Sequence, residues 1–452
     1  MHYGSGKLAA RVVVAGTHSG VGKTTVATGI MAALRARGLR IGAAKVGPDF
    51  IDPGYHRLAA GRPSRCLDAF LSGEGLLASI AAEAGADCDV LVVEGVMGLF
   101  DGSAQPGCDG STAAVAKALD APVVLVVDAS AMSGSVAALV HGFATFDPAL
   151  RLGGVILNRV GSEGHAVLLE EALVPLGVPV LGALLNDDRL AWRERHLGLV
   201  PVAEQPHVVE ESLQRLGEAV ASRLDLEAIV NLARSVPEVR THPLPLPGTV
   251  GHARIAVCSG PAFSFVYPEN LQLFELAGAE LAFFDPLVVP ALPDGCTGLY
   301  AGGGFPEVFA PALAENRRLL AEIGRRAGAD LVTWAECGGF MWLAETIDGH
   351  PMSGALRGVS ITMTDKLVIG YRSASTRKRS FLGPPGTHLL GHEYHRSLAE
   401  PPGDGLVLES RWGRAEAGYL GEKLFAGYLH QHLASTPQLA ERFIAAATQE
   451  AL

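Results

Sequence analysis

Short runs rich in Val, Leu and Ile recur through the first half of the 452-residue chain. Strands that are apolar on both faces are typical of a parallel sheet covered by helices. We expect such strands at residues 11–17, 40–47, 89–96, 122–130, 153–160 and 179–185. Residues 24–37, between the first two runs, have a helical apolar period and complete a β-α-β unit. The first half is therefore predicted to be a parallel α/β domain.

A second α/β domain is expected after a proline-rich segment. Residues 235–252 carry four prolines and no helical periodicity, which is typical of a stiff linker. Strand-like runs then resume at residues 254–260, 279–286, 298–304 and 330–339. We predict a disordered or tag-like N-terminus at 1–10, a first domain at 11–234, a linker at 235–252 and a second domain at 253–452.

Composition excludes several classes of function. A formal net charge of -11 argues against a general nucleic-acid binder, since the phosphate backbone favours basic surfaces. The six cysteines show no C-x-x-C pairing, so they predict neither a zinc site nor a disulfide framework. The N-terminus lacks an apolar signal core, and no long apolar run is present. We expect a cytoplasmic protein that neither binds nucleic acid nor enters a membrane.

The stretch GTHSGVGKTT at residues 16–25 joins the first expected strand to the first expected helix, as a phosphate-binding loop requires. Its glycines allow backbone N–H groups to turn toward phosphate oxygens, while Lys23 adds positive charge and Thr24 offers a hydroxyl to Mg²⁺. Thr17 stands where a glycine is usual in such loops. The alternative interpretation is that the stretch 16–25 is a purely structural turn. The expected nucleotide-binding residues are Gly20, Val21, Gly22, Lys23, Thr24 and Thr25.

Four carboxylates follow the second and third expected strands, at the sheet edge where open α/β folds bind ligands. Asp49 and Asp52 belong to KVGPDFIDPG, while Glu94 and Asp101 belong to EGVMGLFDG. Such a group beside a polyphosphate would repel it unless a cation intervened, which favours Mg²⁺ bound with ATP. We predict Thr24, Asp49 and Glu94 as metal ligands, and catalytic roles for Asp49, Asp52 and Asp101. The alternative is that these carboxylates only cap loops and helices.

Asn158 follows another expected strand, in VILNRV. Its amide presents both a donor and an acceptor, which suits contact with the edge of a purine. We therefore include it among the nucleotide-binding residues. An asparagine chosen only for turn formation is the alternative.

The stretch WAECGGFMWL at residues 334–343 has the form strand, sharp turn, helix, with Cys337 at the turn. Small neighbours tolerate strained dihedral angles at such a nucleophile elbow, and a helix N-terminus lowers the pKa of a thiol. A cysteine nucleophile needs a base, and GYLHQH offers His430 and His432, which would share a face of an extended strand. We predict these three residues as catalytic. A buried structural cysteine is the alternative.

Two further stretches of the second half bear on this site. The glycine run in GLYAGGGFPE, residues 298–307, suits the donation of backbone N–H groups to an oxyanion. GHEYHRS at residues 391–397 resembles a metal motif but lacks histidines four residues apart, so we interpret it as structural or as part of an interface.

Taken together, these motifs resemble the family of cobyrinic acid and hydrogenobyrinic acid a,c-diamide synthases over nearly the whole chain. The motifs that carry this resemblance are KVGPDFIDPGYH, EGVMGLFDG, ERHLGLVP at 194–201, AECGGFMWL and GYLHQH. It implies a P-loop domain similar to dethiobiotin synthetase, followed by a flavodoxin-like class I glutamine amidotransferase domain.

The resemblance also implies an activity. Cys337 would attack glutamine with His430 as its base, and ATP with Mg²⁺ would activate two carboxylates of a corrinoid for amidation by the released ammonia. Other class I amidotransferases carry His-x-Glu where this chain has His432 as the third residue, so a neutral His432 is one candidate for orienting His430. A homodimer is expected. The alternatives are an amidotransferase for another tetrapyrrole, such as nickel sirohydrochlorin or the cobyric acid synthase substrate, and a P-loop regulatory ATPase.

Overall fold

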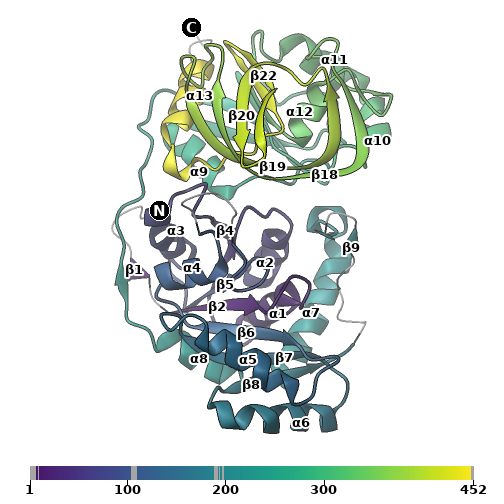
Figure 1. The fold of residues 1–452 in the computed structure, drawn as a ribbon. Coiled ribbons are helices and arrows are strands. Elements are labelled where there is room, and N and C mark those ends of the chain that lie inside the picture. Colours follow the sequence, from purple (N-terminus) through teal and green to yellow (C-terminus); the bar gives the residue numbers. More distant parts are fainter. Residues whose placement is uncertain are drawn as a thin grey trace. The chain divides into compact units, whose positions relative to one another are not determined.

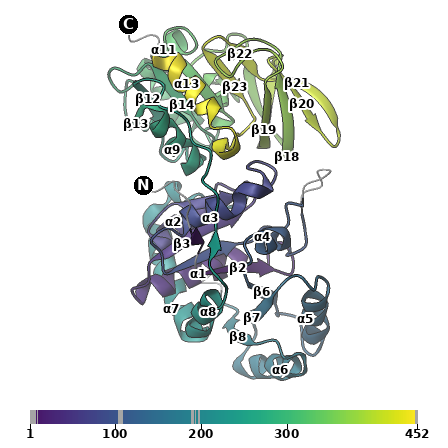
Figure 2. The same ribbon diagram turned by 90° about the vertical axis from the view of Figure 1, so that its left-hand side faces the viewer.

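The structure, a computed structural model, describes residues 7–8, 10–102, 109–187, 192, 194–195 and 198–448. Most of the expected N-terminal segment 1–10, Cys108, and residues 196–197 of the ERHLGLVP motif lie outside these ranges. The chain divides into two compact units, and the division falls between Leu244 and Pro245, inside the segment expected to be the linker. Figures 1 and 2 show both units, and each is described by itself below.

The first unit contains a parallel sheet with helices on both faces (Figures 1 and 2). Its strands are β1 Lys7–Leu8, β2 Arg11–Gly16, β3 Ile41–Val46, β4 Ser64–Leu67, β5 Val90–Glu94, β6 Val123–Asp128, β7 Leu152–Val160, β8 Val180–Leu185, β9 Glu194–Arg195, β10 Gly198–Leu199 and β11 Val239–Arg240. Its helices are α1 Lys23–Ala36, α2 Asp52–Ala60, α3 Leu77–Ala84, α4 Thr112–Ala118, α5 Ser135–Thr145, α6 Glu163–Leu173, α7 Pro206–Arg223 and α8 Leu226–Arg234.

The seven strands of this sheet run in the order β4-β3-β5-β2-β6-β7-β8 and are all parallel, which confirms the predicted fold class. Strands β2, β3 and β5 are buried at every position, because helices cover both faces of the sheet. One core cluster joins β2, β3, β5 and β6 to helices α1, α7 and α8. The carboxyl ends of β2, β3 and β5 therefore lie next to one another at one edge.

The N-terminal segment differs from our expectation at residues 7 and 8. Lys7 and Leu8 form the short strand β1, which pairs antiparallel with Val239 and Arg240 of β11. Leu8 is only 1% exposed, and its carbonyl accepts a hydrogen bond from the guanidinium of Arg11 at 3.1 Å. Burial of the apolar side chain of Leu8 therefore stabilises the fold of this part of the segment.

The second unit carries two six-stranded sheets by strand pairing. Its strands are β12 Ala253–Cys258, β13 Ala279–Phe284, β14 Gly298–Ala301, β15 Val332–Glu336, β16 Thr346–Ile347, β17 His350–Pro351, β18 Ser360–Thr376, β19 His388–Glu400, β20 Leu406–Ser410, β21 Gly413–Ala417, β22 Tyr419–Gly421 and β23 Leu424–Gly427. Its helices are α9 Pro268–Ala277, α10 Ala310–Glu315, α11 Arg317–Arg326, α12 Gly338–Leu343 and α13 Gln438–Thr448.

The first of these sheets, in the order β13-β12-β14-β15-β23-β22, contains the four strands expected from the sequence. Its strand β15 lies between β14 and β23 and is parallel to both. The second sheet was not predicted, and its long strands β18 and β19 pair antiparallel. Residues 391–397 of β19 contribute to the site of this unit, as described below.

Candidate active site

The P-loop of the first unit connects β2 to α1 with a tight turn. Gly20 and Gly22 have φ angles of 83° and 95°, a left-handed conformation that side-chain-bearing residues rarely adopt. Helix α1 begins at Lys23, whose ammonium group donates to the carbonyl of His18 at 3.2 Å. Burial, together with the charge of Lys45, lowers the pKa of Lys23 to about 8. The loop and the helix N-terminus together form a cradle that suits phosphate.

Asn158 supports this loop from the end of β7. Its side-chain nitrogen donates to the carbonyl of Val21 at 2.8 Å, and a Cβ atom on Gly22 would come within 2.3 Å of the same nitrogen. The donor of the amide is therefore used to hold the P-loop. Neither turn formation nor contact with a purine, the two roles that we considered from the sequence, accounts for this hydrogen bond.

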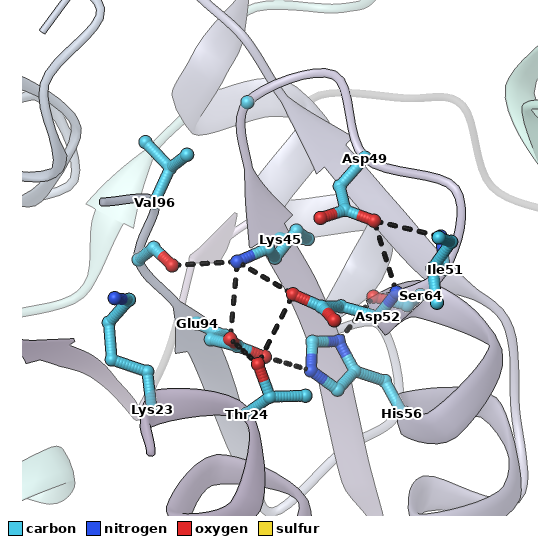
Figure 3. A network of polar contacts seen from close by, with 12 residues as sticks. Lys23, Thr24, Lys45, Asp49, Ile51, Asp52, His56, Ser64, Glu94 and Val96 are labelled. Carbon is cyan, nitrogen blue, oxygen red and sulfur yellow. Dashed lines mark hydrogen bonds and ion pairs between the residues drawn. The ribbon is translucent and has the colours of Figure 1, made fainter. Parts of the chain in front are cut away.

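A buried network of polar side chains lies beside the P-loop, where β3 and β5 end (Figure 3). The ammonium group of Lys45 lies 3.1 Å from Glu94 Oε1 and 3.1 Å from Asp52 Oδ2, and it also donates to the carbonyl of Gly95 at 2.7 Å. The hydroxyl of Thr24 donates to Glu94 Oε1 at 2.6 Å and lies 3.3 Å from Asp52 Oδ2. The structure thus brings together three predicted residues around a lysine that was not predicted.

The charges in this network are unequally distributed. Burial would raise the pKa of Glu94, but the charge of Lys45 and the hydrogen bond from His56 outweigh it and hold that pKa below its usual range. Burial, with the charges of Asp49 and Glu94, raises the pKa of Asp52 well above its ordinary value, although Lys45 acts in the opposite direction. Lys45 therefore compensates the charge of Glu94, and Asp52 is the carboxyl that more readily keeps a proton.

His56 in α2 is a second residue that sequence reasoning missed. Its ring is completely buried, with Nε2 2.5 Å from Glu94 Oε2 and Nδ1 3.2 Å from the hydroxyl of Ser64. Glu94 is thereby held through both oxygens, by His56 on one side and by Thr24 and Lys45 on the other. Lys45 and His56 both belong to the motif KVGPDFIDPGYH, so their proximity to the carboxylates in the sequence was the available signal.

The remaining two carboxylates make local hydrogen bonds. Asp49 Oδ1 accepts from the backbone N–H groups of Ile51 and Asp52, at 2.8 and 3.1 Å, where α2 begins. In Figure 3 the other oxygen of Asp49 points away from these donors. Asp101 Oδ2 accepts from the N–H of Gly98 at 2.8 Å. Both observations match the capping alternative, and capping by one oxygen leaves the other for a ligand.

No preformed metal site is found among the residues that the structure describes. Thr24, Glu94 and Asp52 nevertheless supply oxygen atoms next to the P-loop, and oxygen is the donor that Mg²⁺ prefers. Lys45 provides part of the positive charge for which we had invoked Mg²⁺. The residues present therefore fit a magnesium ion that arrives with a nucleotide.

In the second unit, Cys337 occupies the strained turn predicted from the sequence. It follows β15 and precedes α12, with a φ angle of 47°, and its N–H donates to the carbonyl of Gly427 at 2.8 Å. The thiol is 3% exposed, and its Sγ lies 3.8 Å from the carbonyl of Tyr394 in β19. The expectation of a lowered pKa is wrong for this state, because burial and the charge of Glu307 raise the pKa of Cys337. In this structure the thiol therefore favours its protonated form.

The glycine run packs directly against this turn. A Cβ atom on Gly338 would lie 2.9 Å from the nitrogen of Gly304, and one on Gly339 would lie 2.1 Å from the carbonyl oxygen of Ala301. Only glycine allows these approaches. The N–H of Gly303, however, donates to the carbonyl of Phe265 at 3.0 Å, so it is already engaged in a backbone hydrogen bond.

His430 and His432 do not share the face of a strand as predicted, because β23 ends at Gly427 and both residues follow it. A Cβ atom on Gly303 would lie 2.4 Å from Cε1 of His430, which places this imidazole beside the glycine run. His432 instead has Nε2 3.8 Å from Glu269 in α9. His430 and His432 are thus directed to different surroundings.

The segment GHEYHRS belongs to β19 and holds the base candidate in place. His392 and His430 exchange two backbone hydrogen bonds, of 3.0 and 2.9 Å, and their rings stack with centroids 5.0 Å apart. The hydroxyl of Tyr267 lies 3.0 Å from Nε2 of His392. This supports the structural interpretation of the segment.

Comparison with known families agrees with the two units. Residues 12–200 match the family described as CobQ/CobB/MinD/ParA nucleotide binding domain. Residues 254–438 match the CobB/CobQ-like glutamine amidotransferase domain. The fold and the two sites thus define an enzyme that uses a nucleotide and glutamine for amidation. A regulatory ATPase would not account for the second unit.

Curated relatives narrow this class. The chain is 44% identical to hydrogenobyrinate a,c-diamide synthase of Streptomyces coelicolor, with 97% of this chain and 98% of the relative covered. It is 43% identical to cobyrinate a,c-diamide synthase of Syntrophotalea carbinolica, with 96% and 98% covered. Among solved structures, the MinD cell division protein of Aquifex aeolicus aligns over 51% of this chain and 99% of its own, at 17% identity and a TM-score of 0.31. The chain belongs to the a,c-diamide synthase family, as its motifs predicted.

Proposed function

We propose that this enzyme converts the a and c side-chain carboxylates of cobyrinic or hydrogenobyrinic acid into amides, at the expense of ATP and glutamine, in cobalamin biosynthesis. The observation that carries the proposal is the presence, in one chain, of a P-loop with a buried acidic network and a nucleophile elbow followed by a histidine. The relatives named for hydrogenobyrinate and cobyrinate are almost equally similar, so both acids are candidate substrates.

In the second unit, the thiol of Cys337 attacks the carboxamide carbon of glutamine. His430 takes the thiol proton and gives it to the leaving nitrogen, so that ammonia departs and a thioester forms. Water then releases glutamate from the thioester. Buried surroundings favour this order of events, because the neutral thiol and imidazole become an ion pair only when the substrate reaches them.

In the first unit, an oxygen of the corrinoid carboxylate attacks the γ-phosphorus of ATP, and ADP leaves. Ammonia then attacks the carbonyl carbon of the acyl phosphate, and phosphate leaves. Gly20, Val21, Gly22, Lys23 and the backbone N–H groups of Thr24 and Thr25 bind the phosphates. Asn158 steadies the loop, with its amide oxygen as the remaining candidate for a base contact.

Mg²⁺ would be held by Thr24 with Asp52, Glu94 or the second oxygen of Asp49, and would neutralise the charge that develops on the phosphates. Asp101 and whichever of these carboxylates is not a metal ligand would position the substrate or ammonia. The reaction would take place in the cytoplasm, where ATP and glutamine are available. Among the described helices, none has the length and apolar character needed to span a membrane.

The test is incubation of the purified protein with ATP, Mg²⁺, glutamine and one of three substrates, cobyrinic acid, hydrogenobyrinic acid or nickel sirohydrochlorin, followed by mass spectrometry. The proposal predicts two successive replacements of a hydroxyl group by an amino group, with one ATP consumed for each. A product with a single amide, or amidation of nickel sirohydrochlorin instead, would contradict it. Light scattering on the same preparation measures whether the enzyme is the expected homodimer.

A further inference from the structure

A buried carboxylate immediately precedes the candidate nucleophile. Glu336 is the last residue of β15 and is only 1% exposed. Its Oε1 accepts from the indole N–H of Trp334 at 2.9 Å and from the backbone N–H of Gln431 at 3.4 Å. Its Oε2 accepts from the hydroxyl of Tyr300 at 3.4 Å and lies 4.0 Å from Nδ1 of His430. The carboxylate therefore lies beside the ring of the base candidate and accepts a hydrogen bond from the backbone that follows it.

A cysteine–histidine pair works best when a third group fixes the imidazole in the tautomer that can accept the thiol proton. The residue two positions after His430 does not fill this role in the structure. It is His432, whose ring faces Glu269 at 3.8 Å and packs edge-on against Tyr267. The carboxylate near His430 comes from β15, which pairs with β23 through Glu336 and Gly427.

We propose that Glu336 is a positioning residue that orients His430 for proton transfer from Cys337. The inference rests on the proposed glutamine hydrolysis. In the reacting complex, Nδ1–H of His430, which lies 4.0 Å from Oε2 in this structure, moves within hydrogen-bond distance of the carboxylate, which leaves Nε2 to accept the thiol proton while Sγ attacks the glutamine carbonyl. The imidazolium then returns that proton to the departing ammonia, and the carboxylate stabilises the transient positive charge without itself taking a proton.

The buried surroundings of Glu336 shift its pKa, so its ionisation can be followed in the pH dependence of the reaction. Burial raises its pKa to about 8, although hydrogen bonds from Trp334, Gln431 and Tyr300 act in the opposite direction. Of the titratable groups that face it, burial moves the pKa values of Tyr300 and Cys337 further up and that of His430 further down. We therefore expect glutamine hydrolysis to depend on the ionisation of Glu336.

A purely structural role is the competing explanation, since Glu336 also satisfies Trp334 and Tyr300. Glu336→Gln keeps the shape and removes the negative charge that the carboxyl carries above about pH 8, so the rates are compared at about pH 9. For positioning, we expect kcat for glutamine hydrolysis to fall about 10- to 100-fold with little change in KM, and ammonia-driven amidation to be unaffected. The matched control Tyr300→Phe removes a donor to the same carboxylate, and should change kcat less than about threefold. Equal effects of the two variants would overturn the proposal.

The pH profile gives a readout that a structural role would not move. In the parent, kcat should rise with pH through about 8 as Glu336 ionises, and Glu336→Gln should lose that ionisation. An unchanged ascending limb in the variant would contradict the assignment. If the parent hydrolyses no glutamine at all, the proposed function fails rather than the role of Glu336.

A double-mutant cycle covers the case in which Glu336→Gln folds poorly. The rate at which iodoacetamide, a small carboxamide, alkylates Cys337 is measured in the parent, Glu336→Gln, His430→Ala and the double variant. Positioning through His430 predicts that Glu336→Gln slows alkylation in the parent but has no effect once His430 is replaced. The same slowing in both backgrounds would show that Glu336 acts on the fold alone.

Discussion

At the scale of single residues, Lys45 supplies positive charge that balances the buried carboxylates of the first site. Lys45 is 3% exposed, and its ammonium group lies 3.1 Å from Glu94 and 3.1 Å from Asp52. Burial would lower the pKa of Lys45, but the surrounding carboxylates outweigh it and raise that pKa. The lysine is therefore a fixed charge of the folded enzyme, present before nucleotide or Mg²⁺ arrives.

Replacing this lysine should be costly. Lys45→Met leaves two carboxylates buried without their cation, which we expect to destabilise the first unit by about 3–5 kcal/mol. Urea unfolding measures this. The control Lys117→Met breaks an exposed ion pair with Asp147, of 2.7 Å, and should cost less than about 1 kcal/mol. Equal losses of unfolding free energy in the two variants would show that the buried ion pairs of Lys45 stabilise the fold no more than an exposed ion pair does.

His56 acts on the same network through Glu94. His56→Leu removes the donor to Glu94 Oε2. We expect ATP-dependent amidation to fall about 10- to 100-fold, because the hydrogen bond from His56 fixes the orientation of the Glu94 carboxylate. His56→Gln, which keeps a donor, should recover most of the activity. Glutamine hydrolysis by either variant serves as the internal control and should not change. If His56→Gln is as inactive as His56→Leu, the imidazole of His56 contributes packing alone.

At the scale of elements, apolar runs in the sequence predicted six of the seven strands of the first unit's parallel sheet, missing the short strand β4, and predicted nothing of the second sheet of the second unit. Strands β2 and β5 are buried throughout and rich in Val, so their runs were sufficient, whereas β4 is equally buried but consists only of the four residues SRCL. Strand β18 is mostly half-buried or exposed, and its polar residues gave no alternating pattern. Its register depends on pairing with β19, a contact between distant parts of the chain that no local pattern contains.

The candidate site could be predicted to a similar extent. Thr24, Glu94 and Asp52 were found because they follow buried strands or lie in the P-loop motif. Lys45 was missed because a lysine inside a strand is not expected to be buried unless its partners are known. Glu336 was missed because its neighbours His430 and Gln431 are distant along the chain, with 95 positions separating Glu336 from Gln431.

Helix α2 offers an element-scale test of Asp49. Asp49→Asn keeps an oxygen to accept from Ile51 and Asp52, whereas Asp49→Ala loses this cap and should destabilise the unit by about 1 kcal/mol. If the carboxylate also serves phosphoryl transfer, ADP formation with saturating corrinoid and ammonia should fall on the order of 100-fold in both variants. Parental turnover and unchanged Mg²⁺ dependence in Asp49→Asn would leave Asp49 with the capping role alone.

The end of β15 offers a second element-scale test, of stability against pH. The pKa of Glu336 in the fold, about 8, lies above the ordinary value of 4.5, so the folded state favours the protonated form. Its contribution to stability is complete below the ordinary carboxyl pKa and is lost as pH rises through about 8. The second unit should therefore melt at a lower temperature at about pH 9 than at about pH 6. Glu336→Gln should flatten this difference, and an equal difference in the variant would assign it to other groups.

At the scale of the whole molecule, two chemistries share one chain. The unit up to Leu244 carries the P-loop and its acidic network, and the unit from Pro245 carries Cys337 and His430. The account requires that ammonia made in the second unit be consumed in the first. It therefore predicts that each chemistry can be removed without the other.

The transfer of nitrogen tests this requirement most directly. The parent and two variants are incubated with ATP, Mg²⁺, hydrogenobyrinic or cobyrinic acid, and either glutamine labelled with ¹⁵N at its amide or unlabelled ammonium, and the product is examined by mass spectrometry. We expect the parent to form a diamide with both new nitrogens labelled, Cys337→Ala to form it only from ammonium, and Lys23→Ala to form it from neither while still hydrolysing glutamine. An unlabelled product from the parent, or a Cys337→Ala variant that is equally inactive with ammonium, would contradict the account.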